Sequence, residues 1–222
     1  GMIQLRTLRE AKIKKGTRVI LRADLDVGVK RGQIVDDLRI LAGLPTIKYL
    51  LRRGAHVRIV GYLGRPGGKR DKKLTLRPVA RRLEKILRRK VIFLSDPFEK
   101  KVIAKHIDSE DIIFFENIRF WPEELENSAS FAGRMAQWGQ IYINDAFANS
   151  HRKEASVATL AKLLPSFAGL HLEKEVLMLL KRLNLIPVKK TKDAVEDTIP
   201  TYRNDLKIEE DIIEEDARLY GY

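Results

Sequence analysis

The sequence of 222 residues contains no cysteine. Disulfide bonds, thiolate metal sites and cysteine nucleophiles are therefore excluded. The chain also lacks any run of about 18 apolar residues, the length that a membrane-spanning helix requires. Its first residues lack the apolar stretch of a secretory signal peptide. We therefore expect a cytoplasmic protein without a membrane anchor.

Histidine is scarce, and its four copies are scattered along the chain without the spacing of metal ligands. With no thiolates available either, we expect no metal site in this chain. The histidines are His56, His106, His151 and His171.

Basic residues exceed acidic ones, 43 Lys and Arg against 30 Asp and Glu, which gives a formal net charge of +13. The excess lies in residues 1–184, because residues 185–222 hold 6 basic and 10 acidic residues. Such a charge is typical of a protein that binds nucleic acid or a small anion, or of a well-solvated surface. Nucleic acid is the weakest of these alternatives, since the sequence has no zinc ligands, no aromatic RNA-binding pattern and no helix-turn-helix signal.

Apolar runs rich in β-branched and aromatic residues alternate with stretches of helical period. Near-continuous apolar runs are typical of strands buried on both faces. Strands that alternate with helices predict an α/β fold, a three-layer, Rossmann-like parallel sheet with helices on both faces. We expect strands at 18–24, 56–62, 90–94, 111–117 and 140–146, and helices at 37–54, 76–89, 96–107 and 128–139.

Arginine or a carboxylate follows most of the predicted strands. In a parallel sheet the carboxyl ends of the strands meet at one edge, and ligands bind there. A guanidinium group matches the geometry of a phosphate or a carboxylate. We therefore expect an anion site at this edge, built from segments far apart in the sequence.

One of these strand exits is rich in glycine, with the sequence GYLGRPGGKR at residues 61–70. It matches neither the phosphate loop GxxxxGK[ST] nor the dinucleotide pattern GxGxxG. From its residues alone it is either an anion-binding loop or a basic surface turn.

Six motifs follow one another along the chain: RADLDVG, IVDDLRILAGLPTIKYLLRRGAHV, GYLGRPGG, LRPVARRLEKIL, ENIRFWPEE and INDAFANSHRKEAS. In this order and spacing they resemble the N-terminal domain of phosphoglycerate kinase. No single motif is specific, but their order and spacing are. The resemblance covers about residues 5 to 183, and the segment LPSFAGLHLEKEV at 164–176 is similar to the end of that domain.

The resemblance implies that this domain binds 3-phosphoglycerate or 1,3-bisphosphoglycerate in a basic patch. His151 is implied to support its neighbour Arg152. The substrate-binding positions that match the family are Asp24, Asp26, Arg39, Tyr62, Gly64, Arg65, Arg119, His151 and Arg152.

The resemblance also implies a role for several of these residues. Arg39 matches the catalytic arginine that stabilises the phosphoryl group during transfer. Arg65, Arg119 and Arg152 are implied to hold the phosphate that is not transferred. Asp24 is implied to bind a substrate hydroxyl or a neighbouring arginine. Phosphoryl transfer requires such positioning and charge neutralisation more than a covalent nucleophile.

Four positions depart from the family pattern. Asp26 replaces the usual Asn, Gly28 replaces Pro, Tyr62 replaces a histidine, and Glu154 stands where the family often has a second histidine. The changes at Asp26, Tyr62 and Glu154 make the site less positive, so we expect weaker substrate binding than the arginines alone would give.

We divide the chain into a substrate-binding domain at 1–184 and an appendage at 185–222, an extended connector followed by an acidic helix at 208–220. Nothing after residue 184 resembles the nucleotide-binding domain of the family. The MgADP or MgATP that the family implies would then bind a separate domain, and this chain would hold no cofactor and be inactive alone. The alternatives left open are a working kinase, through a partner chain or an unrecognised site in the appendage, and a non-catalytic anion-binding or interaction protein.

Overall fold

The computed structural model describes the chain except for residues 1, 151, 183–186, 191–193 and 199–222. A parallel sheet of six strands forms its centre. This sheet confirms the predicted α/β fold, and five of its strands lie in the five predicted segments. In spatial order the strands are β6 (Val91–Leu94), β7 (Ile112–Phe115), β5 (His56–Val60), β2 (Arg18–Arg22), β8 (Ile141–Asn144) and β9 (Ser166–Ala168).

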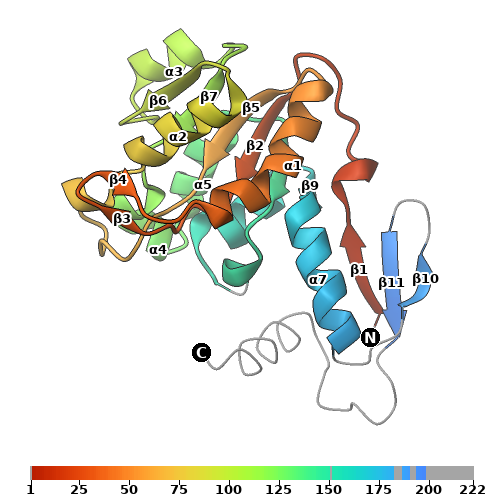
Figure 1. Ribbon diagram of the computed structural model, residues 1–222. Helices are drawn as coiled ribbons and strands as arrows, with labels where there is room; N and C mark the ends of the chain where they lie inside the picture. The colour runs from red at the N-terminus through yellow and green to blue at the C-terminus, as the bar shows by residue number, and fades with distance from the viewer. Residues whose placement is uncertain (1, 151, 183–186, 191–193, 199–222) are drawn as a thin grey trace.

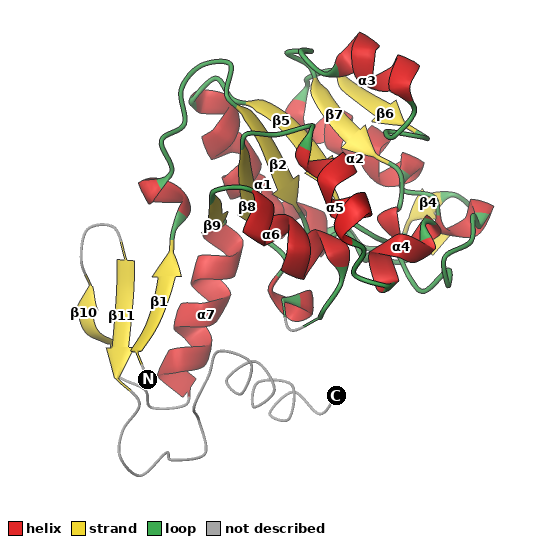
Figure 2. Cartoon of the chain, turned by 180° about the vertical axis from the view of Figure 1, so that it is seen from behind, coloured by secondary structure: helices red, strands yellow, loops and turns green. Residues whose placement is uncertain are grey.

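Helices cover both faces of this sheet, as predicted (Figures 1 and 2). On one face lie α1 (Leu38–Arg52) and α2 (Arg77–Leu87), and α7 (Leu170–Arg182) packs beside α1. The other face carries α3 (Lys100–His106), α5 (Ala129–Ala136) and the short α6 (Leu160–Leu163). Among the described residues, no helix combines the length and apolar character needed to cross a bilayer.

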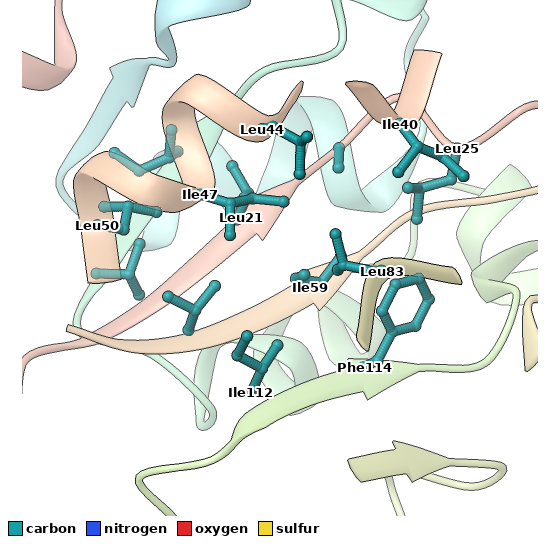
Figure 3. Close-up of a cluster of buried hydrophobic side chains, with 14 of the residues drawn as sticks. Leu21, Leu25, Ile40, Leu44, Ile47, Leu50, Ile59, Leu83, Ile112 and Phe114 are labelled. Carbon is teal, nitrogen blue, oxygen red and sulfur yellow. The ribbon is translucent and has the colours of Figure 1, made fainter. Parts of the chain in front are cut away.

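Successive strand residues serve opposite faces of the sheet. Leu21 and Ile59 pack under α1 and α2, and Figure 3 shows them against Leu44 and Leu83. The neighbouring Ile20 packs in a separate cluster, under α5. Each such side chain contributes about 1.5–3 kcal/mol by its burial. The continuous apolar runs in the sequence reflect these two buried faces.

Local signals explain the boundaries of the first two helices. Gly54 adopts φ +73° just after α1, the left-handed conformation of a C-terminal glycine cap. Pro78 lies in the first turn of α2, where its missing N–H leaves no helical hydrogen bond unmade. Asp37, which precedes α1, pairs with Arg82 of α2 at 2.6 Å and ties the two helices together.

Three sheet features were not predicted. The edge strand β9 has only three residues. A two-stranded ribbon, β3 (Val29–Lys30) and β4 (Gln33–Ile34), follows the loop after β2. A second sheet of three antiparallel strands has the order β1 (Met2–Arg6), β11 (Ala194–Thr198), β10 (Pro187–Lys190).

That second sheet lies beside α7 (Figures 1 and 2) and approaches the edge strand β9 of the main sheet. It pairs residues from both sides of the predicted boundary at 184/185, so part of the expected connector forms strands. The division at 184/185 itself stays a prediction. The acidic helix predicted at 208–220 lies outside the described residues.

Asp145, at the exit of β8, joins the main sheet to α7. Its Oδ1 accepts hydrogen bonds from the backbone N–H groups of His171 and Leu172, at 2.9 and 3.1 Å. The backbone N–H of Gly169 donates to the carbonyl of Asn144 at 2.8 Å. Together these bonds hold the first turn of α7 against the carboxyl edge of the sheet.

Candidate functional site

The predicted site residues that the structure describes lie beyond the carboxyl ends of the strands or at the start of α1. Asp24 and Asp26 follow β2, Tyr62 to Arg65 follow β5, and Arg119 lies in a short 3-10 helix (Ile118–Phe120) after β7. Arg152 comes from the long segment after β8. His151 lies outside the described residues.

Gly64, in the loop after β5, links that loop to the loops after β2 and β7. The Oδ1 atom of Asp26 accepts the backbone N–H of Gly64 at 2.8 Å, and Arg119 donates through Nη1 to the carbonyl of Gly64 at 3.0 Å. Gly64 has φ +61°, and an added Cβ would lie 2.9 Å from Leu74 Cδ2. The left-handed conformation therefore favours glycine here, and a larger residue would also have to displace the end of the Leu74 side chain.

Arg39 pairs with Asp24, with 2.6 Å between Nη1 and Oδ2. Burial lowers the pKa of Arg39, but the carboxylates of Asp24 and Asp26 outweigh burial and raise it overall. The guanidinium is therefore permanently charged, and its side chain remains 46% exposed. Arg39 is both a cation and accessible, as the predicted role requires.

Arg119 is buried, with 3% exposure. Its Nη2 donates to Glu154 Oε1 at 2.6 Å, and the ring of Tyr62 lies 3.5 Å from its Cζ. Burial raises the pKa of Tyr62, so the phenol is neutral where the family pattern has a histidine. The two unusual residues Tyr62 and Glu154 thus meet on one arginine.

Behind this pair lies a second buried layer that was not predicted. Arg22, at the end of β2, donates through Nε to Ser156 Oγ at 3.0 Å. Ser156 binds Glu124 through both its hydroxyl and its backbone N–H. Burial raises the pKa of Glu124 to about 7, although the Ser156 hydroxyl and the charge of Arg22 oppose this. The sequence signal for this layer was Arg22, which directly follows three apolar residues in the strand RVILR.

Several of these buried groups are not fully bonded. Within the described residues, no hydrogen-bond partner is found for Arg22 Nη1 and Nη2, Arg119 Nε or Glu154 Oε2. Buried donors without a partner carry a cost of about 1–3 kcal/mol each, and such groups are frequent at binding sites. The site therefore retains unused capacity to donate hydrogen bonds.

Arg65 and Arg152 form the accessible part of the site. Arg65 is exposed, and its side chain makes no hydrogen bond or ion pair to the described residues. Arg152 is 38% exposed and lies 3.9 Å from Glu154 Oε1, the same atom that binds Arg119. With Arg39, these two guanidinium groups can reach an anion from solvent.

The arrangement brings arginines from four separated segments to one edge, with carboxylates between them. It can bind an anionic ligand through bidentate, charge-assisted hydrogen bonds. Within the described part of the chain, no group of three or more His, Asp or Glu side chains is placed to bind a metal ion.

Comparison with known proteins identifies relatives of this chain. The family model described as phosphoglycerate kinase matches residues 8–190. Phosphoglycerate kinases of Coprothermobacter proteolyticus and Desulforudis audaxviator are both 45% identical, over 177 and 185 residues. These alignments cover 78% and 82% of this chain, but 45% and 47% of the relatives.

A solved structure leads to the same family. The phosphoglycerate kinase of Coxiella burnetii is 36% identical, with a TM-score of 0.71 over 83% of this chain and 46% of that one. The chain therefore spans a little under half the length of these relatives. Its matched residues include the whole parallel sheet and every described site residue, and the chain belongs to the phosphoglycerate kinase family.

Proposed function

We propose that this chain is the substrate-binding half of a phosphoglycerate kinase and that it binds 3-phosphoglycerate or 1,3-bisphosphoglycerate at the carboxyl edge of its sheet. The observation that carries the proposal is the convergence of Arg39, Arg65, Arg119 and Arg152 from four segments of the chain. These segments match the family in order and spacing. A ligand with a phosphate at one end and a carboxylate or acyl phosphate at the other suits such a spread of cations.

Each arginine then has a distinct role. Arg65 and Arg152 bind the phosphate that stays on the substrate, with Arg119 behind them. Arg39 neutralises the phosphoryl group as it passes between the substrate carboxylate and the terminal phosphate of ADP, while Asp24 orients Arg39 through their 2.6 Å contact. Catalysis of this kind requires positioning and charge neutralisation, with no covalent intermediate on the protein.

We further propose that the chain does not complete the reaction alone. The Mg²⁺-bound nucleotide would bind a separate domain, and residues 1–184 would act as the substrate-binding domain. On this proposal the reaction belongs to glycolysis and the protein acts in the cytoplasm.

Substrate binding is tested by titrating 3-phosphoglycerate into the purified chain by calorimetry near pH 7 and low salt. We expect binding, and we expect Arg65→Met and Arg152→Met each to weaken it by roughly tenfold, the value of one charge-assisted contact. Arg89→Met is the matched control, because Arg89 is an exposed arginine next to the start of β6, at the opposite edge. Absence of binding, or equal loss in all three variants, would contradict the proposal.

Activity is tested separately with a coupled assay of ATP formation from 1,3-bisphosphoglycerate and MgADP. We expect no turnover above that of the heat-denatured chain. Turnover by the purified chain that Arg39→Met abolishes would overturn the statement that it is inactive alone, while leaving the substrate-binding proposal intact.

A further inference from the structure

We propose that Glu154 acts as an internal counter-anion in this site, occupying Arg119 and holding the affinity for phosphate low. The inference rests on the proposed substrate-binding function, which it makes specific to this chain. It assigns Glu154 as the residue that sets how strongly the site binds a highly charged ligand.

The contacts of Arg119 carry the first step. One edge of its guanidinium donates to Glu154 at 2.6 Å and to the carbonyl of Gly64 at 3.0 Å, and its face lies against Tyr62. The Glu154 and Tyr62 side chains are themselves buried, each with 5% exposure for the whole residue. A phosphate arriving from solvent therefore meets Arg119 only after Glu154 or Tyr62 has moved.

The position of the carboxylate carries the second step. Glu154 lies among three guanidinium groups, at 2.6 Å from Arg119, 3.7 Å from Arg22 and 3.9 Å from Arg152. Three cations around one point form the most favourable location for an anion in this part of the molecule. The protein has placed its own carboxylate there.

The fit of Glu154 to this location is incomplete, which is the third step. Its Oε2 and both terminal nitrogens of Arg22 lack hydrogen-bond partners within the described residues. A phosphate has more acceptor oxygens than a carboxylate and carries up to two charges, so it can use donors that Glu154 leaves unused. Removing the carboxylate should therefore make the site a stronger phosphate receptor.

The test is calorimetric titration of 3-phosphoglycerate into Glu154→Gln and the unmodified protein under identical conditions. Glutamine keeps the size and one acceptor oxygen but removes the charge. We expect Glu154→Gln to bind 3-phosphoglycerate about tenfold more tightly than the unmodified protein does. Its melting temperature without ligand should fall, because Arg22 and Arg119 lose their counter-charge, and 3-phosphoglycerate should restore it.

Glu123→Gln is the matched control. Glu123 also pairs with an arginine, Arg134 at 3.1 Å, but both side chains are more than a third exposed. This variant makes the same change in net charge and breaks the same type of pair outside the site. We expect its affinity to equal that of the unmodified protein. An equal gain in both variants would mean that net charge alone acts, and would overturn the inference.

A second variant guards against failure of Glu154→Gln to fold. Tyr62→His with Glu154→His places at both positions the histidine of the family pattern, and it should show the same gain. If either folded variant binds no more tightly than the unmodified protein, while Arg65→Met and Arg152→Met still weaken binding, the inference fails and the proposed function stands. If no protein in the series binds 3-phosphoglycerate, both fail.

Discussion

Glu124 is a carboxyl group in a fully enclosed position on α4 (Pro122–Leu125). Among the described residues, its two oxygens accept hydrogen bonds from Ser156 alone, and the charge of Arg22 acts on it without a direct hydrogen bond. Burial therefore dominates and raises its pKa to about 7. Near neutral pH the group changes between charged and neutral beside the buried arginine of the site.

The first residue-scale prediction concerns pH. Between about pH 4.5 and 7 the unfolded chain has lost the Glu124 proton while the folded protein keeps it, so the free energy of unfolding falls as pH rises. The fall attributable to this group is about 3 kcal/mol. Glu124→Gln should remove it. Urea denaturation at pH 5, 6, 7 and 8 measures the difference in slope between the two proteins.

Asp145 also makes the free energy of unfolding depend on pH, so this dependence does not disappear completely in Glu124→Gln. Burial raises the pKa of Asp145 to about 6, which gives a slope of the same sign that ends at lower pH. The variant should therefore keep some dependence up to about pH 6 and lose the dependence between pH 6 and 7. An unchanged slope in that upper interval would contradict the role given to Glu124.

Individual residues of the site were predicted from the sequence, but the contacts between them were not. Arg39, Arg65, Arg119 and Arg152 were found because each stands in a motif that resembles the family, three of them after strands and Arg39 at the start of α1. The meeting of Tyr62 and Glu154 on Arg119 was not foreseen, because their motifs lie on different strand exits and only the folded loops bring them together. Burial of Arg119 was equally hidden, since an arginine in a loop is usually exposed.

At the scale of elements, the loop after β5 is shaped by glycines in the left-handed region. Gly67 has φ +67° with no atom within 4 Å of an added Cβ, whereas Gly68 has φ +76° and its Cβ would lie 2.9 Å from Pro122 Cβ. The N–H of Gly68 also donates to the carbonyl of Arg119 at 3.1 Å. Gly68 therefore anchors the loop against the start of α4, and Gly67 does not.

This difference predicts unequal effects of one substitution at adjacent positions. Gly67→Ala should cost about 1–2 kcal/mol, the strain of a left-handed alanine. Gly68→Ala carries the same strain and must also displace backbone atoms at Pro122, so it should cost at least about 1 kcal/mol more. It should also weaken 3-phosphoglycerate binding by shifting Arg65. Chemical denaturation of both variants checks the order; equal costs would contradict the anchoring role.

The elements themselves were predictable to different degrees. Five strands of the main sheet were predicted from their apolar runs. Helix α1 ends before a glycine cap, as expected. Strand β9 was not predicted, because the three residues SFA are too few to show a hydrophobic periodicity. The strand is stabilised by its pairing with β8. The pairing of β1 with β11 was not predicted, because nearly the whole sequence separates the two strands. No local sequence signal specifies such a contact.

At the scale of the whole molecule, two sheets meet near β9. An isolated bridge joins Thr7, which follows β1, to Ala168 of β9. The small sheet, however, depends on β11, which pairs with β1 on one side and β10 on the other. The first strand of the chain is therefore held by one of the last described segments.

Truncation after residue 190 tests this dependence. Removing β11 leaves β1 without its antiparallel partner, so amide protection in residues 2–6 should fall sharply. Residues 18–22, in the centre of the main sheet, should stay protected because β2 pairs with both β5 and β8. Hydrogen–deuterium exchange measured by mass spectrometry distinguishes the two regions. Equal loss of protection in both would show that the sheets form one cooperative unit.

The bonds between Asp145 and the first turn of α7 leave no space at the residue before that turn. Gly169 needs no left-handed conformation, but any Cβ added to it would overlap the carboxylate of Asp145. Alanine, the smallest replacement, is thus as unacceptable as a bulky residue until Asp145 itself is changed. In a library of all substitutions at position 169, selected for folded protein, we expect to recover only glycine. Other residues at position 169 should be recovered only in clones that carry a smaller residue at position 145.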